Sequence, residues 1–232
     1  MNYSPLAPFY QLIERCTMGT ALQRARTGQL TRLAGLTVPQ RVLIVGEGDG
    51  SFLLTVARQF PEAAITVVEP SAGMVARAQA RLRRAGLLSQ RIVFTVKPLL
   101  EAALPEASFD LIVTLFFLDN FEDALMRASV AKLSACASER AYWLLSDFCL
   151  PPCGWRRLRA QFWLKVLYRF FGVAAGLTAR ELPDLEAAIE ATDFTLLDRQ
   201  TSCGGLLFSA LYRQEVARSR QRVYLFEKCS NS

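Results

Sequence analysis

Residues 41–50 read RVLIVGEGDG, and this stretch decides the fold. Val42–Val45 is apolar at every position, as expected of a strand that is buried on both faces of a parallel sheet. Glycines follow at positions 46, 48 and 50, and a helical pattern of apolar residues resumes over 51–60. Such a turn tolerates positive φ angles and lets a ligand approach backbone amides closely. The stretch therefore predicts a strand, loop and helix that bind a nucleotide.

The spacing of the glycines narrows the class of nucleotide. The NAD fingerprint G-x-G-x-x-G would require glycine at 51 or 53, where the chain has Ser51 and Leu53. The phosphate-binding motif G-x-x-x-x-G-K-[ST] does not occur in the sequence. Glu69 ends a second apolar run, 23 positions after Gly46, where a carboxylate can accept hydrogen bonds from both hydroxyls of a ribose. Together, the loop and Glu69 predict a nucleoside ligand.

Strands and helices alternate along the first two thirds of the chain. Further strands are expected at 65–68, 92–96, 111–116 and 142–146, with helices at 51–60, 73–85 and 124–134. This alternation predicts an α/β fold of the Rossmann type, with a doubly wound, mostly parallel sheet. After Pro151 the alternation stops. Helices over 155–171 and 182–191 then precede two strands, 196–201 and 206–213, which are expected to close the sheet as an antiparallel pair.

The whole chain, 1–232, is expected to form a single domain with five parts. They are an N-terminal helical cap (1–35), a cofactor-binding core (36–150), a helical lid (151–192), closing strands (193–213) and a polar tail (214–232). No apolar run reaches the roughly 20 residues that cross a bilayer. The first 16 residues lack the basic start and continuous apolar segment of a secretory signal. We therefore expect a cytoplasmic protein.

Composition limits the available chemistry. The chain contains no histidine, which excludes a Ser-His-Asp triad, a Cys-His pair and an imidazole base. Its six cysteines lack the spacing of a metal site or a disulfide framework, so we expect reduced thiols and no bound metal. Any proton acceptor must therefore be a carboxylate, tyrosine, lysine, cysteine or water. The net charge of +6 fits either an anionic partner or solubility alone.

Four segments carry a resemblance to a known family. They are VLIVGEGDGSF (42–52), ITVVEPSAGMVARAQ (65–79), FDLIVTLFFLDNFED (109–123) and YWLLSDFCLPP (142–152). In this order they resemble the motifs of class I S-adenosylmethionine-dependent methyltransferases, over residues 40–150 and more loosely to 213. Within that family the chain looks closest to small-molecule methyltransferases of the quinone- and lipid-biosynthesis type. Several of these begin with a segment comparable to residues 3–10.

The resemblance implies S-adenosylmethionine as the cofactor. Its methionyl end is then expected at the glycine loop, its ribose at Glu69 and its adenine beside Met74. Tyr10 either caps the cofactor from the N-terminal helix or packs as an ordinary aromatic side chain. The full set of cofactor-binding residues implied in this way is Tyr10, Gly46, Glu47, Gly48, Asp49, Gly50, Glu69, Pro70, Met74, Leu99 and Leu115.

The chain departs from the family at two positions. Many members have an acid two residues before the first glycine, where this chain has Ile44. Glu47 and Asp49 either supply that charge to the ammonium of the cofactor or are exposed turn residues. Where members often carry an acid against the adenine, this chain has Lys97, so its adenine pocket is expected to rely on backbone and Leu99. These departures leave open an alternative, a non-catalytic member of the fold that serves as a binding or scaffolding subunit.

Catalysis is expected to centre on Asp119. Methyl transfer is an in-line displacement that depends largely on positioning, and a base is needed only where the acceptor must lose a proton. The resemblance implies that residues after the fourth strand face the transferred methyl, and Asp119 is the carboxylate there. The alternative is that Asp119 caps a helix beginning near Glu122. Asp147, after the fifth strand, is a further candidate for the rim of the pocket.

The partner is expected to be a small apolar or anionic acceptor, admitted between residues 1–35 and 151–192. The stretch 155–171 is basic and aromatic, which fits either a lid with snorkelling arginines or a transient contact with a membrane surface. Nucleic acid is not expected, because no DNA- or RNA-binding module is recognisable. A dinucleotide oxidoreductase is disfavoured by Ser51 and Leu53.

Overall fold

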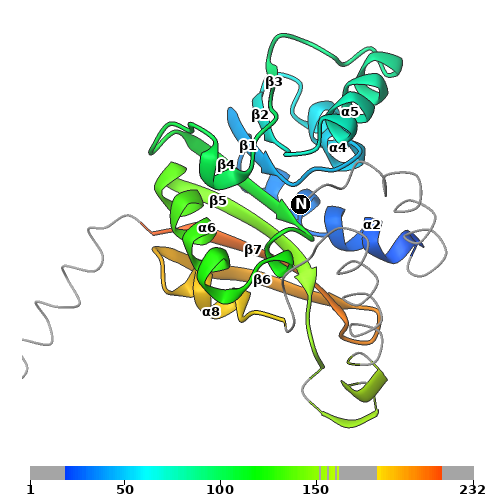
Figure 1. The fold of residues 1–232 in the computed structure, drawn as a ribbon, viewed down its shortest axis with the longest axis vertical. Helices are drawn as coiled ribbons and strands as arrows, with labels where there is room; N and C mark the ends of the chain where they lie inside the picture. Colours follow the sequence, from blue (N-terminus) through cyan, green and yellow to red (C-terminus); the bar gives the residue numbers. More distant parts are fainter. Residues whose placement is uncertain (1–18, 152, 156, 160, 162–181, 216–232) are drawn as a thin grey trace, which may run out of the picture.

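A computed structural model describes residues 19–151, 153–155, 157–159, 161 and 182–215. In these residues seven strands form one sheet, with helices packed against it (Figure 1). The strand order is β3-β2-β1-β4-β5-β7-β6. Strands β1 to β5 pair in parallel, and β7 pairs antiparallel with both β5 and β6. The predicted Rossmann-type sheet with an antiparallel closing strand is therefore confirmed.

The strands lie close to the positions that their apolar runs indicate. Their bounds are β1 Arg41–Val45, β2 Ala64–Val68, β3 Ile92–Thr95, β4 Phe109–Leu115, β5 Ala137–Phe148, β6 Phe194–Ser202 and β7 Leu207–Gln214. β5 is longer than the predicted 142–146. Its first half contains Glu139 and Arg140, polar residues that conceal a strand in the sequence. The φ angle of Arg140 is positive, and the pairing of β4 with β5 shifts register between Phe109 and Leu111.

The helices connect these strands and cover the sheet. They are α2 Gly19–Thr27, α3 Leu30–Ala34, α4 Ser51–Gln59, α5 Ala72–Arg84, α6 Asp123–Cys136 and α8 Leu185–Glu190, with short 3-10 turns η1 Leu99–Glu101 and η2 Leu118–Asn120. The helix predicted over 182–191 is shorter because Asp184 forms its N-cap, accepting a hydrogen bond from the Ala187 amide at 3.1 Å. No helix in the described part of the chain combines the length and apolarity needed to cross a membrane.

Two apolar clusters form the core. One contains residues of α3, α4 and α5 packed with the sheet, and the other contains residues of α6 and α8. Trp143 is the largest fully buried side chain, and its indole nitrogen donates a hydrogen bond to Thr114 Oγ1 at 2.9 Å. The Trp143 ring also meets Phe194 edge to face, with 5.3 Å between ring centroids. The buried Trp143 side chain therefore has a hydrogen-bond partner for its indole N–H as well as apolar contacts for its ring.

Buried hydrogen bonds fix the N-terminal helices against the sheet. Ser146 Oγ of β5 donates to the carbonyl of Ala25 in α2 at 2.9 Å. Gln29 Nε2, between α2 and α3, donates to Asp198 Oδ2 of β6 at 2.8 Å and to the Ser209 carbonyl of β7 at 3.3 Å. These contacts hold α2 close to the carboxyl end of β5.

Candidate functional site

The candidate site lies where the order of the parallel strands reverses. β1 has β2 on one side and β4 on the other, so the loops that leave β1 and β4 diverge. Ligands of open α/β sheets bind in the crevice at the carboxyl ends of such strands. The glycine loop after β1, Glu69 after β2, η2 after β4 and Asp147 near the end of β5 all belong to this edge.

The three glycines of the loop have positive φ angles but different surroundings. A Cβ on Gly46 would overlap the ring of Phe117, and a Cβ on Gly50 would lie 2.6 Å from the Cα of Ala78. These two positions require glycine because other parts of the protein pack against them. Gly48, with φ of +68°, has no atom of the described residues within 4 Å of the place where a Cβ would stand. The loop is therefore open to a ligand at Gly48.

Glu69 lies beside this open position. Its side chain is buried, with 6% of the residue exposed. Oε2 accepts a hydrogen bond from the Gly48 amide at 3.2 Å, and Oε1 accepts one from the Ser71 amide at 3.0 Å. Burial raises the pKa of Glu69, and these two bonds oppose the rise. A carboxylate has about four lone-pair sites, so two are left for the ribose hydroxyls that the sequence predicts here.

The two acids of the loop differ in their partners. Asp49 accepts a hydrogen bond from the Ser51 amide at 3.1 Å and forms an ion pair with Arg81 of α5. Glu47 Oε1 accepts a hydrogen bond from the Leu53 amide at 2.9 Å, in the first turn of α4. Glu47 Oε2 is buried and has no hydrogen-bond partner among the described residues. Burial raises the pKa of Glu47 to about 8. Of the two acids, Glu47 is therefore the one with a buried carboxylate oxygen that lacks a hydrogen-bond donor among the described residues.

A small pocket adjoins the loop and reaches α2. Arg26 closes it on the α2 side, and its guanidinium carbon lies 5.4 Å from the centroid of the Phe116 ring. Sequence reasoning missed Arg26, because the basic pattern of residues 19–35 does not show which arginine faces the loop. The lining residues are Arg26, Ile44, Val45, Gly46, Glu47, Ser51, Phe52 and Leu115.

The other residues that the sequence predicts to bind the cofactor differ in burial and in the element that carries them. Met74 is buried in the first turn of α5, and its amide donates a hydrogen bond to Ser71 Oγ at 3.3 Å. Pro70 is exposed beside it, whereas Leu99 is buried in η1. Leu115 is buried and lines the pocket beside the glycine loop. The prediction for Tyr10 lies outside the described residues.

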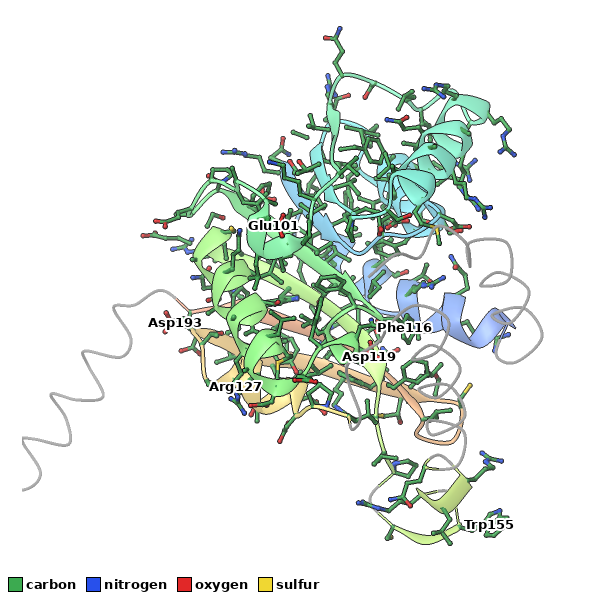
Figure 2. The ribbon with its side chains drawn as sticks, in the orientation of Figure 1. Glu101, Phe116, Asp119, Arg127, Trp155 and Asp193 are labelled. Atoms are coloured by element: carbon green, nitrogen blue, oxygen red, sulfur yellow. The ribbon has the colours of Figure 1, made fainter. Side chains whose placement is uncertain are left out.

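The segment after β4 is held in an unusual conformation. Phe116 has a φ of +53°, which is rare for a bulky residue. Its amide donates a hydrogen bond to the Ser146 carbonyl at 2.7 Å. Asn120 Nδ2 lies 3.0 Å from each of three acceptors, the carbonyls of Phe116 and Phe117 and Oδ1 of Asp119. One amide therefore ties the strained residue to the candidate catalytic carboxylate, and Figure 2 shows Phe116 and Asp119 close together at this edge.

Asp119 and Asp147 form a buried pair of acids. Asp119 lies in η2 with 4% of its surface exposed, and its amide donates to Asp147 Oδ2 at 3.4 Å. Asp147 is fully buried, and its Oδ1 accepts a hydrogen bond from the Phe148 amide at 2.9 Å. Burial raises the pKa of Asp119 to about 6. Burial and the neighbouring Asp119 charge raise the pKa of Asp147 well above its ordinary value. The alternative that Asp119 caps a helix is wrong, because the N-cap of α6 is Glu122.

Apolar side chains continue the site beyond this pair. Phe148 meets Phe116 edge to face, with 5.3 Å between ring centroids. Phe148 also packs with Leu206, and Leu150, Leu182 and Cys203 join the same cluster. The pair of buried acids thus lies beside a cluster of aromatic and aliphatic side chains.

Comparison with known proteins identifies the domain. Residues 42–139 match the family model of a methyltransferase domain. A search of curated proteins finds no significant match. Residues 42–139, less than half of the chain, are thus similar to a methyltransferase domain. The fold of the chain is that of the class I S-adenosylmethionine-dependent methyltransferases, as the four motifs predict.

Solved structures share this fold at low sequence identity. The N-methyltransferase NodS from Bradyrhizobium japonicum WM9, in complex with S-adenosylhomocysteine, is 19% identical with a TM-score of 0.60, over 83% of this chain and 87% of NodS. The Burkholderia thailandensis 1,6-didemethyltoxoflavin-N1-methyltransferase, with bound S-adenosylhomocysteine, is 18% identical with a TM-score of 0.59, over 91% and 88%. The [4+2]-cyclase SpnF is 16% identical with a TM-score of 0.63, over 93% and 97%. Proteins that share this fold therefore include one that is named for a cyclisation and not for methyl transfer.

Proposed function

We propose that this chain transfers a methyl group from S-adenosylmethionine to a small-molecule acceptor. One observation carries the proposal: the open position at Gly48 lies beside the buried carboxylate of Glu69, at the strand edge where this fold binds ligands. Both residues fall within the segment that matches the methyltransferase domain model. NodS and the toxoflavin enzyme hold S-adenosylhomocysteine in the same fold, which supports this cofactor here.

The residues present fit the cofactor. Gly48 leaves room for it to approach the backbone, Glu69 has lone pairs for the ribose, and the unpartnered Oε2 of Glu47 suits an ammonium. Met74 and Leu99 offer apolar surface for the adenine. When bound, S-adenosylmethionine supplies an electrophilic methyl group on a sulfonium. The protein then has to orient the acceptor, exclude water and receive a proton where the acceptor carries one.

Asp119 is the proposed proton acceptor. Its pKa of about 6 leaves most of this carboxyl ionised at pH 7, and burial together with the Asp119 charge raises the pKa of the neighbouring Asp147. The ionised Asp119 then takes a proton from an acceptor O–H or N–H. Asn120 orients Asp119 through the bond from Nδ2 to Oδ1. Phe116 and Phe148 form an aromatic wall nearby, which favours an acceptor with an apolar body.

The start of the lid offers a route for such acceptors. Trp155 is 76% exposed and Leu158 is 60% exposed, beside the exposed Arg157 and Arg159. Figure 2 shows Trp155 at the end of the molecule away from α5. We propose that this surface touches anionic membranes transiently. Vesicles with and without anionic lipid test this, because binding should require the anionic lipid and weaken in Trp155→Ala.

The direct test of the function is a binding and turnover experiment. Calorimetry should show that S-adenosylmethionine and S-adenosylhomocysteine bind, whereas titration with NADH should show no binding. Incubation with S-adenosylmethionine and a panel of hydroxylated and amino aromatic compounds should release S-adenosylhomocysteine. Binding without turnover on any acceptor would favour the non-catalytic alternative, for which Ile44 at the usual acidic position is the supporting observation. Absence of binding would refute the proposal.

A further inference from the structure

Positive charge is concentrated in residues 70–100, which run from the end of β2 through α5 and β3. This segment contains six basic residues and no acidic residue, whereas the whole chain has 27 basic and 21 acidic residues. The six are Arg77, Arg81, Arg83, Arg84, Arg91 and Lys97. A surface with one sign of charge attracts partners of the opposite sign and repels those of its own.

Three of these cations are exposed and form no ion pair with a described residue. They are Arg83, Arg84 and Lys97. By contrast, Arg81 pairs with Asp49 of the glycine loop. Arg91 pairs with Glu62. The first two unpaired cations end α5 and the third follows β3 by two residues, so they precede and follow this strand in the chain.

β3 forms one edge of the sheet. It pairs with β2 on one side, and no strand of the described residues pairs with it on the other. The Arg91 carbonyl accepts a hydrogen bond from the Ile65 amide at 2.8 Å. The Thr95 carbonyl accepts one from the Glu69 amide at 3.1 Å. Because main-chain groups alternate in direction along a strand, those of Phe94 point to the open edge, where a further strand can bind them.

Exposed apolar side chains accompany this edge. Val93 of β3 has 55% of its surface exposed, and Leu88 and Val96 are exposed as well. Phe94 is the only aromatic residue of the segment, and its side chain packs against a core cluster shared with α5. Figure 1 shows β3 and α5 at the same end of the molecule. The exposed residues of this end form what we call the β3 surface: Arg83, Arg84, Leu88, Val93, Val96 and Lys97.

Three kinds of occupant fit the β3 surface poorly. A bilayer offers its open main-chain groups no hydrogen-bond partner. Single-stranded nucleic acid stacks its bases on aromatic rings, and the one aromatic ring of the segment packs against the core. A second copy of this chain would bring the same cations to the same edge. Open main-chain groups, apolar contacts and positive charge together match an extended acidic segment of a protein.

We propose that the β3 surface binds an acidic segment of a partner protein, which adds to the sheet as a strand beside β3. Hydrogen bonds to the main chain of β3 hold the segment extended, and its apolar side chains contact Val93. Its carboxylates meet the unpaired cations of the surface. Asp119 and Asp147 lie at the ends of β4 and β5, so partner binding and the proposed methyl transfer use different parts of the sheet.

Fluorescence anisotropy with labelled synthetic peptides tests this proposal. The probe is a short alternation of glutamate and valine. One matched peptide has proline in place of valine, which removes main-chain donors, and another has lysine in place of glutamate. The glutamate–valine peptide should bind, with an affinity that falls as salt screens the charges, and the other two peptides should not.

A double charge reversal locates the binding surface. Arg83→Glu with Arg84→Glu should weaken the glutamate–valine peptide by about five- to thirtyfold, because attractive pairs become repulsive. Arg140→Glu with Arg213→Glu changes the net charge equally at exposed arginines outside the segment, and should leave the affinity nearly unchanged. Both double variants should bind S-adenosylhomocysteine like the unaltered protein, because none of these arginines belongs to the candidate site.

Hydrogen exchange of the Phe94 amide reports the added strand directly. This amide points to the open edge, so its exchange should be fast in the free protein and slow in the peptide complex. A peptide held by charge alone would leave the exchange unchanged. This measurement uses the unaltered protein and therefore decides even where a double variant fails to fold.

The proposal is supported if the glutamate–valine peptide binds, weakens in Arg83→Glu with Arg84→Glu, and protects the Phe94 amide. Equal binding of the proline peptide, equal weakening in the two double variants, or an unprotected Phe94 amide would overturn it. Absence of peptide binding would overturn it as well. A DNA duplex or anionic vesicles that then bind through Arg83 and Arg84 would assign the surface to nucleic acid or to a membrane instead.

Discussion

Gly48→Ala and Gly86→Ala form a matched pair of substitutions that tests the cofactor site. Both glycines have a φ of +68°, and in the described part of the chain no atom lies within 4 Å of a Cβ added to either. A residue other than glycine in the left-handed region costs about 1–2 kcal/mol. Both variants should therefore lose about this much unfolding free energy, which a domain of typical stability tolerates. Gly86 follows the C-cap of α5, away from the glycine loop.

The two variants should differ in cofactor affinity. The methyl group of Gly48→Ala enters the space where a ligand approaches the loop, and overpacking of this kind costs about 1–3 kcal/mol, or about five- to 150-fold in dissociation constant. Calorimetry with S-adenosylhomocysteine measures the affinity, and urea denaturation measures the stability. Gly86→Ala should bind like the unaltered protein. If Gly48→Ala also binds normally while showing the same loss of stability, the ligand does not approach this loop.

Three further predictions follow from the same geometry. Gly50→Ala should lose more stability in urea than the other glycine variants, because its Cβ would lie 2.6 Å from the Ala78 Cα. Asp119→Asn should slow methyl transfer by about 10²- to 10⁴-fold without changing S-adenosylhomocysteine affinity, and normal turnover would remove Asp119 from the mechanism. Asp119 and Glu47 have folded pKa values of about 6 and 8, and that of Asp147 is also raised. The folded state then binds more protons, so unfolding free energy should fall as pH rises from about 4 to 8, and a flat profile in urea would contradict these shifts.

The fold could be predicted from local patterns. The continuous apolar run of Val42–Val45 indicates a strand with both faces covered, and the glycines after it allow only a tight turn. The apolar run and the glycines lie within ten residues of one another, so this strand and turn can be predicted without knowledge of tertiary contacts. The start of β5 escaped prediction because Glu139 and Arg140 are exposed and polar, and they lie where the pairing of β4 with β5 shifts register.

The site could be predicted only in part, because its residues meet through tertiary structure. Glu69 follows a strand at a spacing that the sequence displays. The partnership of Asp119 with Asp147 joins the ends of β4 and β5, which are 28 positions apart, and no spacing rule indicates it. Aspartate is also common at helix N-caps, so the sequence alone could not show that Asp119 is buried. Arg26 reaches the loop only because α2 packs on the closing strands.

The most direct test of the central claim is the affinity of Glu69→Ala for S-adenosylhomocysteine. This change removes the proposed acceptor of the ribose hydroxyls, and losing hydrogen bonds to a charged group costs on the order of 1.5–3 kcal/mol, or about ten- to a hundredfold in affinity. Glu101→Ala, an exposed acid on η1, is the control and should bind normally. Calorimetry should therefore show binding to the unaltered protein and the control, and weakened binding to a folded Glu69→Ala. Unchanged affinity in Glu69→Ala, or no binding by the unaltered protein, would contradict the account.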